Sequence, residues 1–103
     1  MLTTETEIYV ANAGDCRAVM CKNGKMLPLS TDHKPNLPSE KQRIQKNGGR
    51  VENGRINKKI AVSRALGDFE FKTIEPPKEA TSDWFLENHM ITAVPDIKVV
   101  PLT

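Results

Sequence analysis

With 103 residues, 38% of them hydrophobic, the chain is long enough for one small domain but short of apolar residues for closing a core of its own. Its formal net charge of +2 comes from 15 Lys and Arg against 13 Asp and Glu, and the basic residues are interspersed with acidic and polar ones. One Trp, one Tyr and three Phe make no stacking platform, so the composition argues against nucleic-acid binding and favours a piece of a larger fold.

The cysteines and the N-terminus bear on where the protein works. Cys16 and Cys21 lie five positions apart in an extended-looking segment, so their side chains should point to opposite faces of a strand, as half-buried free thiols. Unpaired cysteines favour a reducing compartment. No signal peptide is visible, and no apolar run approaches the ~18 residues of a membrane span. We expect a cytoplasmic or nuclear protein that does not enter a membrane.

The first thirty residues predict three antiparallel strands. Residues 8–12 alternate apolar and polar side chains, and Ala13-Gly14-Asp15 has the composition of a turn. Extended character resumes over 16–21, where Cys16 opens the strand, and Asn23-Gly24 then gives a strong hairpin signal before a return strand at 25–29. We therefore expect a three-stranded meander.

A short helix follows this predicted meander. Residues 39–42 read Ser-Glu-Lys-Gln, which fits a capping box, although Pro38 is equally suited to be the first helical residue. The helix should run to about Lys46 and end at Gly48-Gly49. Because Ile44 is its main apolar residue, we expect it to lean on a sheet.

The second half of the chain mixes short strands with an aperiodic segment. From 68 to 89 no period is visible and two prolines adjoin, so a loop or a small subdomain is expected, which the apolar residues at 84–86 would pin back as a lid-like excursion. Four further short strands are expected, at 50–52, 60–63, 90–94 and 97–100.

The sequence contains none of the usual residue patterns of a metal site or a catalytic nucleophile. His33 and His89 are far apart, and neither has a partner at metal-ligand spacing. Residues 32–35 read Asp-His-Lys-Pro, which is either an acid–base element or, as we favour, a capped turn. Ser63 lacks the sequence context of a nucleophile, so a packed serine at a strand end is expected.

The stretch from Ala61 to Phe69 combines apolar residues with an unexplained pair of charges. It reads as a short buried strand that turns sharply at Gly67. Arg64 either binds an anionic group or forms a buried pair with Asp68 or another carboxylate, and we favour the buried pair.

Five segments cover nearly the whole chain in a recognisable order. Together they resemble the motifs of metal-dependent protein serine/threonine phosphatases of the type 2C class. They are Ile8–Val19 (IYVANAGDCRAV), Leu29–Pro35 (LSTDHKP), Glu40–Gly49 (EKQRIQKNGG), Ala61–Phe69 (AVSRALGDF) and Thr92–Ile97 (TAVPDI).

This resemblance implies a fold of mixed α/β (α+β) class, a partial four-layer αββα sandwich of antiparallel sheets with one or two short helices. Residues 1–103 would be part of one phosphatase domain, and residues 68–90 would be its flap, a variable segment beside the cleft. The family uses Mg²⁺ or Mn²⁺ to activate a water that attacks phosphoserine or phosphothreonine of a phosphoprotein substrate.

The resemblance also implies that most metal ligands of the family lie in segments outside this sequence, so no catalytic residue is assigned here. Asp15 matches a carboxylate that in some members helps to hold a third metal ion. The alternative interpretation is that Asp15 only forms the turn. Candidates for substrate contact in the flap, each of which is equally well plain surface, are Lys72, Lys78, Glu79 and Trp84. The structural signature consists of Arg64, Gly67 and Asp68.

Two functions remain open at this stage. The first is a fragment of the phosphatase catalytic domain that is inactive alone, and the second is a truncated, non-catalytic product that acts as a binding or regulatory module. We also expect poor stability of the chain alone, because sheet edges and inner faces would lie uncovered.

Overall fold

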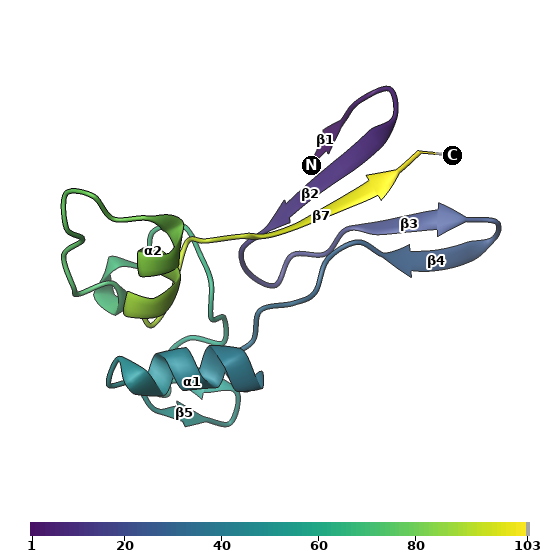
Figure 1. Cartoon of the computed structure of the whole chain (residues 1–103). Helices are drawn as coiled ribbons and strands as arrows, with labels where there is room; N and C mark the ends of the chain where they lie inside the picture. The colour runs from purple at the N-terminus through teal and green to yellow at the C-terminus, as the bar shows by residue number, and fades with distance from the viewer. Residues whose placement is uncertain (103) are drawn as a thin grey trace.

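The computed structural model describes residues 1–102, which form a mixed α+β structure with two α-helices, a 3₁₀ turn and seven strands (Figure 1). This confirms the expected class, with antiparallel sheets and two short helices. The elements in chain order are β1 (Leu2–Thr3), β2 (Glu7–Asn12), β3 (Val19–Lys22), β4 (Lys25–Pro28), α1 (Pro38–Lys46), β5 (Val51–Glu52), β6 (Arg55–Ile56), the 3₁₀ turn (Phe69–Phe71), α2 (Ser82–Asn88) and β7 (Asp96–Pro101).

The largest sheet joins the two ends of the chain. Its order is β1-β2-β7, and β2 pairs antiparallel with β7 from Glu7 opposite Pro101 to Asn12 opposite Asp96. Both edges of β2 are therefore occupied, by β1 and β7, and the expected pairing of β2 with β3 is wrong. The predicted meander fails because the turn after β2 leads the chain away instead of folding it back into a ladder.

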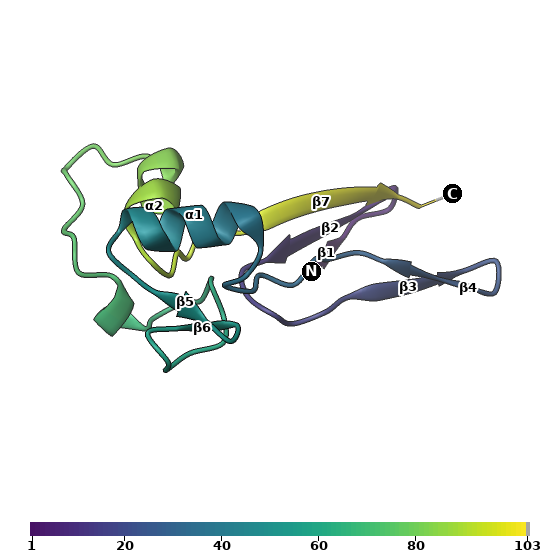
Figure 2. The ribbon, with the colours of Figure 1, turned by 90° about the horizontal axis from the view of Figure 1, so that it is seen from below.

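The hairpin of β3 and β4 forms as predicted but as a sheet of its own. Asn23 and Gly24 have φ of 53° and 75°, the positive values that a tight hairpin turn needs. Figure 2 shows this hairpin running below the β1-β2-β7 sheet. Cys16 precedes β3 instead of opening it, and both Cys16 and Cys21 are exposed free thiols, so the expected half-burial is wrong while the absence of a disulfide is confirmed for these two residues.

Helix α1 begins with Pro38 at its first turn, after Leu37 as the N-cap. No side chain caps this end, so the capping-box alternative is wrong and the proline alternative is confirmed. At the other end Gly48 has φ of +88°, as predicted for the glycine pair, and the amide of Gly49 donates to the carbonyl of Ile44 at 2.9 Å.

The apolar core lies beneath α1. It consists of Ile44, Ile56, Phe71 and Ile91, each at most 6% exposed. The expected strands at 60–63 and 90–94 are wrong: these segments keep only the isolated bridges Ile56–Ile60 and Arg64–Thr92 within the described chain. The polar side chains of 63 and 64 are turned inward to hydrogen-bond with α1, and no continuous ladder forms beside them.

The segment 68–90 is more ordered than its lack of period predicts. It contains the 3₁₀ turn and α2, so of the two expected alternatives, a loop or a small subdomain, the loop is wrong. The ring of Trp84 lies edge-on to those of Phe85 and His89, with centroids 5.3 and 5.4 Å away. The hydroxyl of Thr92 donates to the carbonyl of Phe85 at 2.7 Å, which ties α2 to the chain that follows it.

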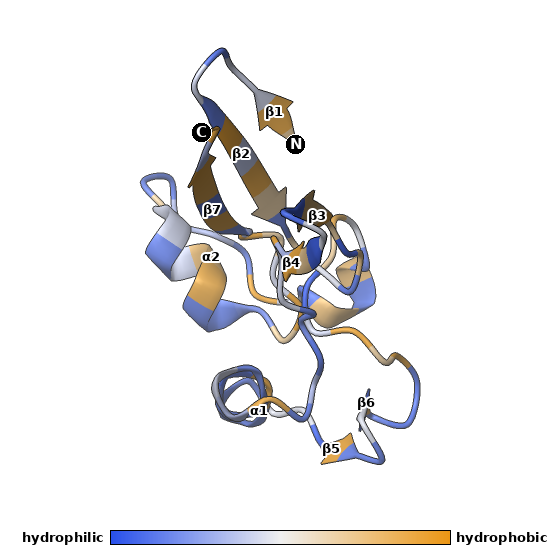
Figure 3. Cartoon of the chain, turned by 90° about the vertical axis from the view of Figure 1, so that its right-hand side faces the viewer, coloured by the Kyte–Doolittle hydropathy of each residue, from blue (hydrophilic) through white to orange (hydrophobic). Residues whose placement is uncertain are grey.

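One face of the β1-β2-β7 sheet is apolar and exposed. Orange segments of these strands in Figure 3 mark their apolar residues. Leu2 lies opposite Tyr9, and Tyr9 lies opposite Val99, so the three share a face. Their exposed fractions are 63%, 36% and 45%. Across residues 1–102, neither helix is long and apolar enough to cross a membrane.

Candidate functional site

The Gly14–Asp15 turn, where the resemblance places a candidate ligand, is held by hydrogen bonds from both sides. The amide of Gly14 donates to Nδ1 of His33 at 3.1 Å, and the amide of His33 donates back to the carbonyl of Gly14 at 2.8 Å. The side-chain amide of Asn12 donates to the same carbonyl at 3.2 Å. Gly14 is buried with φ of +139°, a conformation that favours glycine.

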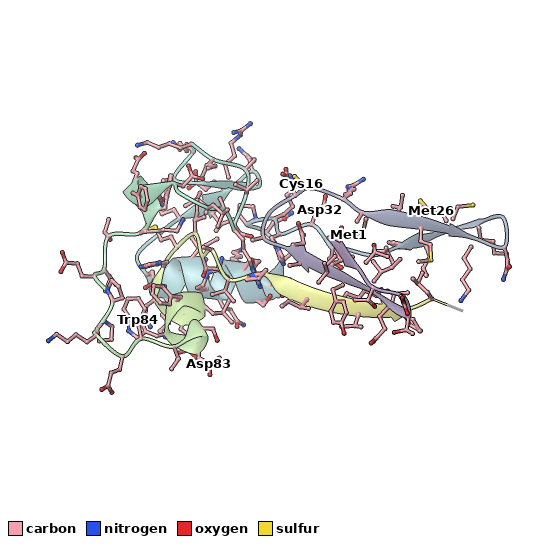
Figure 4. All side chains as sticks on the ribbon, turned by 90° about the horizontal axis from the view of Figure 1, so that it is seen from above. Met1, Cys16, Met26, Asp32, Asp83 and Trp84 are labelled. Carbon is pink, nitrogen blue, oxygen red and sulfur yellow. The ribbon has the colours of Figure 1, made fainter. Side chains whose placement is uncertain are left out.

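Two exposed ion pairs flank this turn. Asp15 accepts from Nζ of Lys34 at 2.8 Å, and this hydrogen bond lowers the pKa of the Asp15 carboxyl. Asp32 pairs with Arg17 at 2.9 Å, and the hydrogen bond from the guanidinium lowers the pKa of Asp32 in the same way. Figure 4 shows Asp32 beside Cys16, at the base of the strands. Both carboxylates are therefore ionised at neutral pH and already paired with cations.

His33 is buried, 3% exposed, and its second ring nitrogen lies 2.8 Å from a carboxylate oxygen of Asp96. A backbone amide can only donate, so Nδ1 of His33 accepts the hydrogen bond from Gly14. The ring proton therefore lies on Nε2, which donates a hydrogen bond to Asp96. The segment 32–35 is thus more than a capped turn. Sequence reasoning missed this partnership because Asp96 lies 63 residues further along the chain.

Glu40 lies at the centre of a buried polar network formed by Glu40, Arg43, Ser63 and Arg64. Arg64 donates to both carboxylate oxygens, at 2.8 and 3.0 Å, and Arg43 donates at 3.0 and 3.4 Å. The hydroxyl of Ser63 donates at 2.8 Å, which confirms the packed serine. Burial alone would raise the pKa of Glu40, but the hydrogen bonds from the two arginines outweigh it and lower the pKa to about 2.

Arg43 extends this network to the end of the segment 68–90. Its guanidinium donates to the carbonyl of Ser63 at 2.6 Å and to the carbonyls of His89 and Met90 at 3.1 and 3.2 Å. One helix residue thereby fixes two later segments of the chain. The sequence signal was present in the spacing of Glu40 and Arg43, which lie on one face of α1.

Arg64 forms the expected buried ion pair, but with another carboxylate, the second of the two alternatives, and not with Asp68. Its partners are Glu40 and Asp96, the latter at 3.1 Å. Asp68 instead adopts a left-handed conformation, with φ of 50°, before the 3₁₀ turn. Gly67, with φ of +78°, makes the predicted sharp turn.

None of the candidate substrate contacts in the segment 68–90 bonds to Asp15, whose partner is Lys34. Lys72 donates to the carbonyls of Ala65 and Gly67, and burial lowers the pKa of its ammonium. Lys78 and Glu79 are exposed in the loop before α2. Trp84 is half-buried on α2, away from Cys16 and the turn beside it (Figure 4).

The described residues do not fit a Mg²⁺ or Mn²⁺ centre. Across residues 1–102, no three His, Cys, Asp or Glu side chains come together as metal ligands. Such ions need several oxygen ligands, and the carboxylate of Asp15 is already engaged by Lys34. What these residues build is a rigid frame around the Gly14–Asp15 turn.

Comparison with known proteins places this frame in a family. The family model described as protein phosphatase 2C matches residues 1–103. "Protein phosphatase 2C homolog 2" of Hypocrea jecorina (strain QM6a) is 47% identical over 102 residues, which are 99% of this chain and 22% of that protein. "Protein phosphatase ppm-1.G" of Caenorhabditis elegans is 44% identical over 102 residues, 99% of this chain and 19% of that protein.

A solved structure supports the same relationship. A crystal structure of a phosphatase from Toxoplasma gondii aligns with a TM-score of 0.75 and 39% identity, over 90% of this chain and 27% of the other. The chain thus spans about a fifth of the length of the two relatives above, at 22% and 19%. The family match, the relatives and the shared fold agree that this chain belongs to the protein phosphatase 2C family.

Proposed function

We propose that this chain is part of a protein serine/threonine phosphatase that hydrolyses phosphoserine and phosphothreonine in phosphoprotein substrates and depends on Mg²⁺ or Mn²⁺. The match of the protein phosphatase 2C model to residues 1–103 carries this proposal. Residues 1–103 would belong to one catalytic domain with residues 68–90 as its flap. A cytoplasmic or nuclear location is supported by the free, exposed thiols of Cys16 and Cys21.

Within that enzyme, we assign this chain a structural role, which is to hold the Gly14–Asp15 turn in place. The buried polar network joins α1 to the Ser63–Arg64 stretch, and Asp96 and His33 continue it to the Gly14–Asp15 turn. The metal ligands would come from other parts of the protein, with Asp15 as a candidate for an additional, weaker position. Lys78, Glu79 and Trp84 remain candidates for contact with substrate, whereas the bonds of Lys72 to Ala65 and Gly67 favour a structural role for it.

A second candidate function, a non-catalytic binding or regulatory module, draws on a different observation. The apolar face formed by Leu2, Tyr9 and Val99 is exposed in this chain. An exposed apolar face of this kind suits contact with another protein surface.

Phosphate release from a phosphoserine peptide, with Mn²⁺ or with EDTA, separates the two candidates. We expect the protein that carries this chain to release phosphate with Mn²⁺ and to stop when EDTA is added, while the 103-residue chain alone releases none. Turnover by the chain alone would refute the purely structural role that we assign to it. A carrier protein without turnover under either condition would refute the phosphatase proposal and favour the binding module.

A further inference from the structure

We propose that His33 is a positioning residue: it fixes the Gly14–Asp15 turn by linking the amide of Gly14 to the carboxylate of Asp96. The two bonds, at 3.1 and 2.8 Å, use both ring nitrogens of a side chain that is 3% exposed. The imidazole therefore acts as a rigid spacer between two segments that are far apart in the sequence.

The direction of each bond follows from the donor inventory of the ring. Gly14 offers an N–H, so Nδ1 of His33 must accept, and the remaining proton sits on Nε2 and points at Asp96. This neutral form satisfies both neighbours at once. A side chain with a donor at the δ position or without a donor at the ε position breaks one of the two links.

The carboxylate of Asp96, which accepts the hydrogen bond from His33, is itself held by other residues. Arg64 donates to the other oxygen of Asp96 at 3.1 Å and to the carbonyl of Val94 at 3.1 Å. Arg64 is in turn held by both oxygens of Glu40, which is 1% exposed. The chain of contacts thus runs from helix α1 through Arg64 and Asp96 to His33, and its one exposed member is Asp96, whose side chain is 61% exposed.

The Gly14–Asp15 turn depends on the bond from His33 because few backbone hydrogen bonds of a strand ladder hold it. No strand ladder joins β2 to β3, so regular pairing does not set the path between them. Gly14 adopts φ of +139°, and a Cβ added there would come within 3.2 Å of the carbonyl oxygen of Arg64. The turn is therefore packed against the same segment that carries the anchor of His33.

The neighbouring residue of His33 extends the effect to the side chain of the turn. Lys34 donates to Asp15 at 2.8 Å, so the segment 33–34 holds both the backbone and the carboxylate of the turn. That this positioning serves catalysis rests on the proposed phosphatase function. That His33 holds the turn rests on the geometry alone, and the two claims can be tested apart.

Two conservative variants in the full protein separate the two bonds. In His33→Asn the amide oxygen takes the δ position and keeps an acceptor for Gly14, whereas in His33→Gln the amide nitrogen reaches the ε position and keeps a donor for Asp96. His89→Gln is the matched control, since His89 is 7% exposed and its ring bonds to the carbonyl of Ile74. The first readout is hydrogen exchange of the Gly14 amide by NMR, with the amides of α1 as internal reference.

We expect His33→Gln to accelerate exchange at Gly14 about tenfold, the effect of losing one buried hydrogen bond, while α1 amides keep their rates. His33→Asn should stay closer to the wild type, and His89→Gln should leave Gly14 unchanged. Exchange at Gly14 within about twofold of the wild type in His33→Gln would overturn the proposal, as would equal acceleration of all amides.

The second readout is the rate of phosphate release from a phosphoserine peptide. We expect kcat to fall about tenfold in His33→Gln and less in His33→Asn, with the KM for the peptide unchanged, because the turn and not the peptide is displaced. Unchanged kcat together with faster exchange at Gly14 would overturn the catalytic use of the turn. A wild-type protein without turnover would refute the proposed function, and the exchange experiment would still decide the role of His33.

Discussion

The carboxylate of Glu40 is the side chain whose removal should most weaken this frame. In Glu40→Gln the shape of the side chain is kept, but the negative charge between Arg43 and Arg64 is lost. Two buried guanidinium groups, 6% and 9% exposed at the side chain, then lose the carboxylate between them, and only Arg64 keeps a counter-charge, from Asp96 at 3.1 Å. Breaking a buried ion pair by removing one partner is strongly destabilising.

The size of the effect follows from the pKa of Glu40. In the folded protein this pKa is about 2, against 4.5 for the free side chain. The gap corresponds to about 3 kcal/mol of stability supplied by the ionised form. Because the pKa in the folded state is the lower one, this contribution is complete above about pH 4.5 and is lost as the pH falls toward 2. Glu40→Gln should therefore lower the free energy of unfolding by about 3 kcal/mol at neutral pH.

Urea unfolding of the full protein that carries this chain, followed by circular dichroism, measures this change. The control is Glu52→Gln, which removes an exposed ion pair with Arg50 at 3.4 Å and should cost less than about 1 kcal/mol. If Glu40→Gln unfolds within about 0.5 kcal/mol of the wild type, or keeps the same acid dependence between pH 4.5 and 2, the assigned role of the network is refuted.

Three further predictions concern the core and the exposed sheet. Ile44→Ala should lower the free energy of unfolding by about 2–5 kcal/mol, because Ile44 is 0% exposed, whereas Leu66→Ala, at an 82% exposed position, should change it by less than about 0.5 kcal/mol in the same urea titration. Gly49→Ala should cost about 1–3 kcal/mol, since the added Cβ would meet Cγ2 of Ile44 at 2.7 Å, and a wild-type unfolding midpoint would contradict the packing. The 103-residue chain alone should melt broadly, because the face with Leu2, Tyr9 and Val99 is exposed, and a sharp cooperative melt of a monomer would count against this expectation.

Local signals predicted the elements that depend on neighbouring residues. Asn23-Gly24 forms the expected hairpin turn, and Pro38 with Gly48 bounds the expected helix. In each case the residue's own backbone preference determines the structure, so a short window of sequence contains the relevant physics. Gly67 is a further example, since its positive φ makes the turn that ends the signature stretch.

Pairing between residues far apart in the sequence could not be predicted from local sequence patterns. Strand β2 pairs with β1 and β7, a partner from the far end of the chain, and no local pattern distinguishes β7 from β3 as its neighbour. The site shows the same limit. The partners of Arg64 are 24 and 32 positions away, at Glu40 and Asp96, and the partner of His33 is 63 positions away.

Calorimetric titration of the 103-residue chain with Mn²⁺ tests most directly whether these residues build the frame and not the metal centre of the phosphatase. One carboxylate paired with Lys34 lacks the oxygen ligands that such an ion needs, so we predict no saturable binding below about 1 mM. One-to-one binding at micromolar Mn²⁺ that disappears in Asp15→Asn would contradict the account and place a metal centre on the Gly14–Asp15 turn itself.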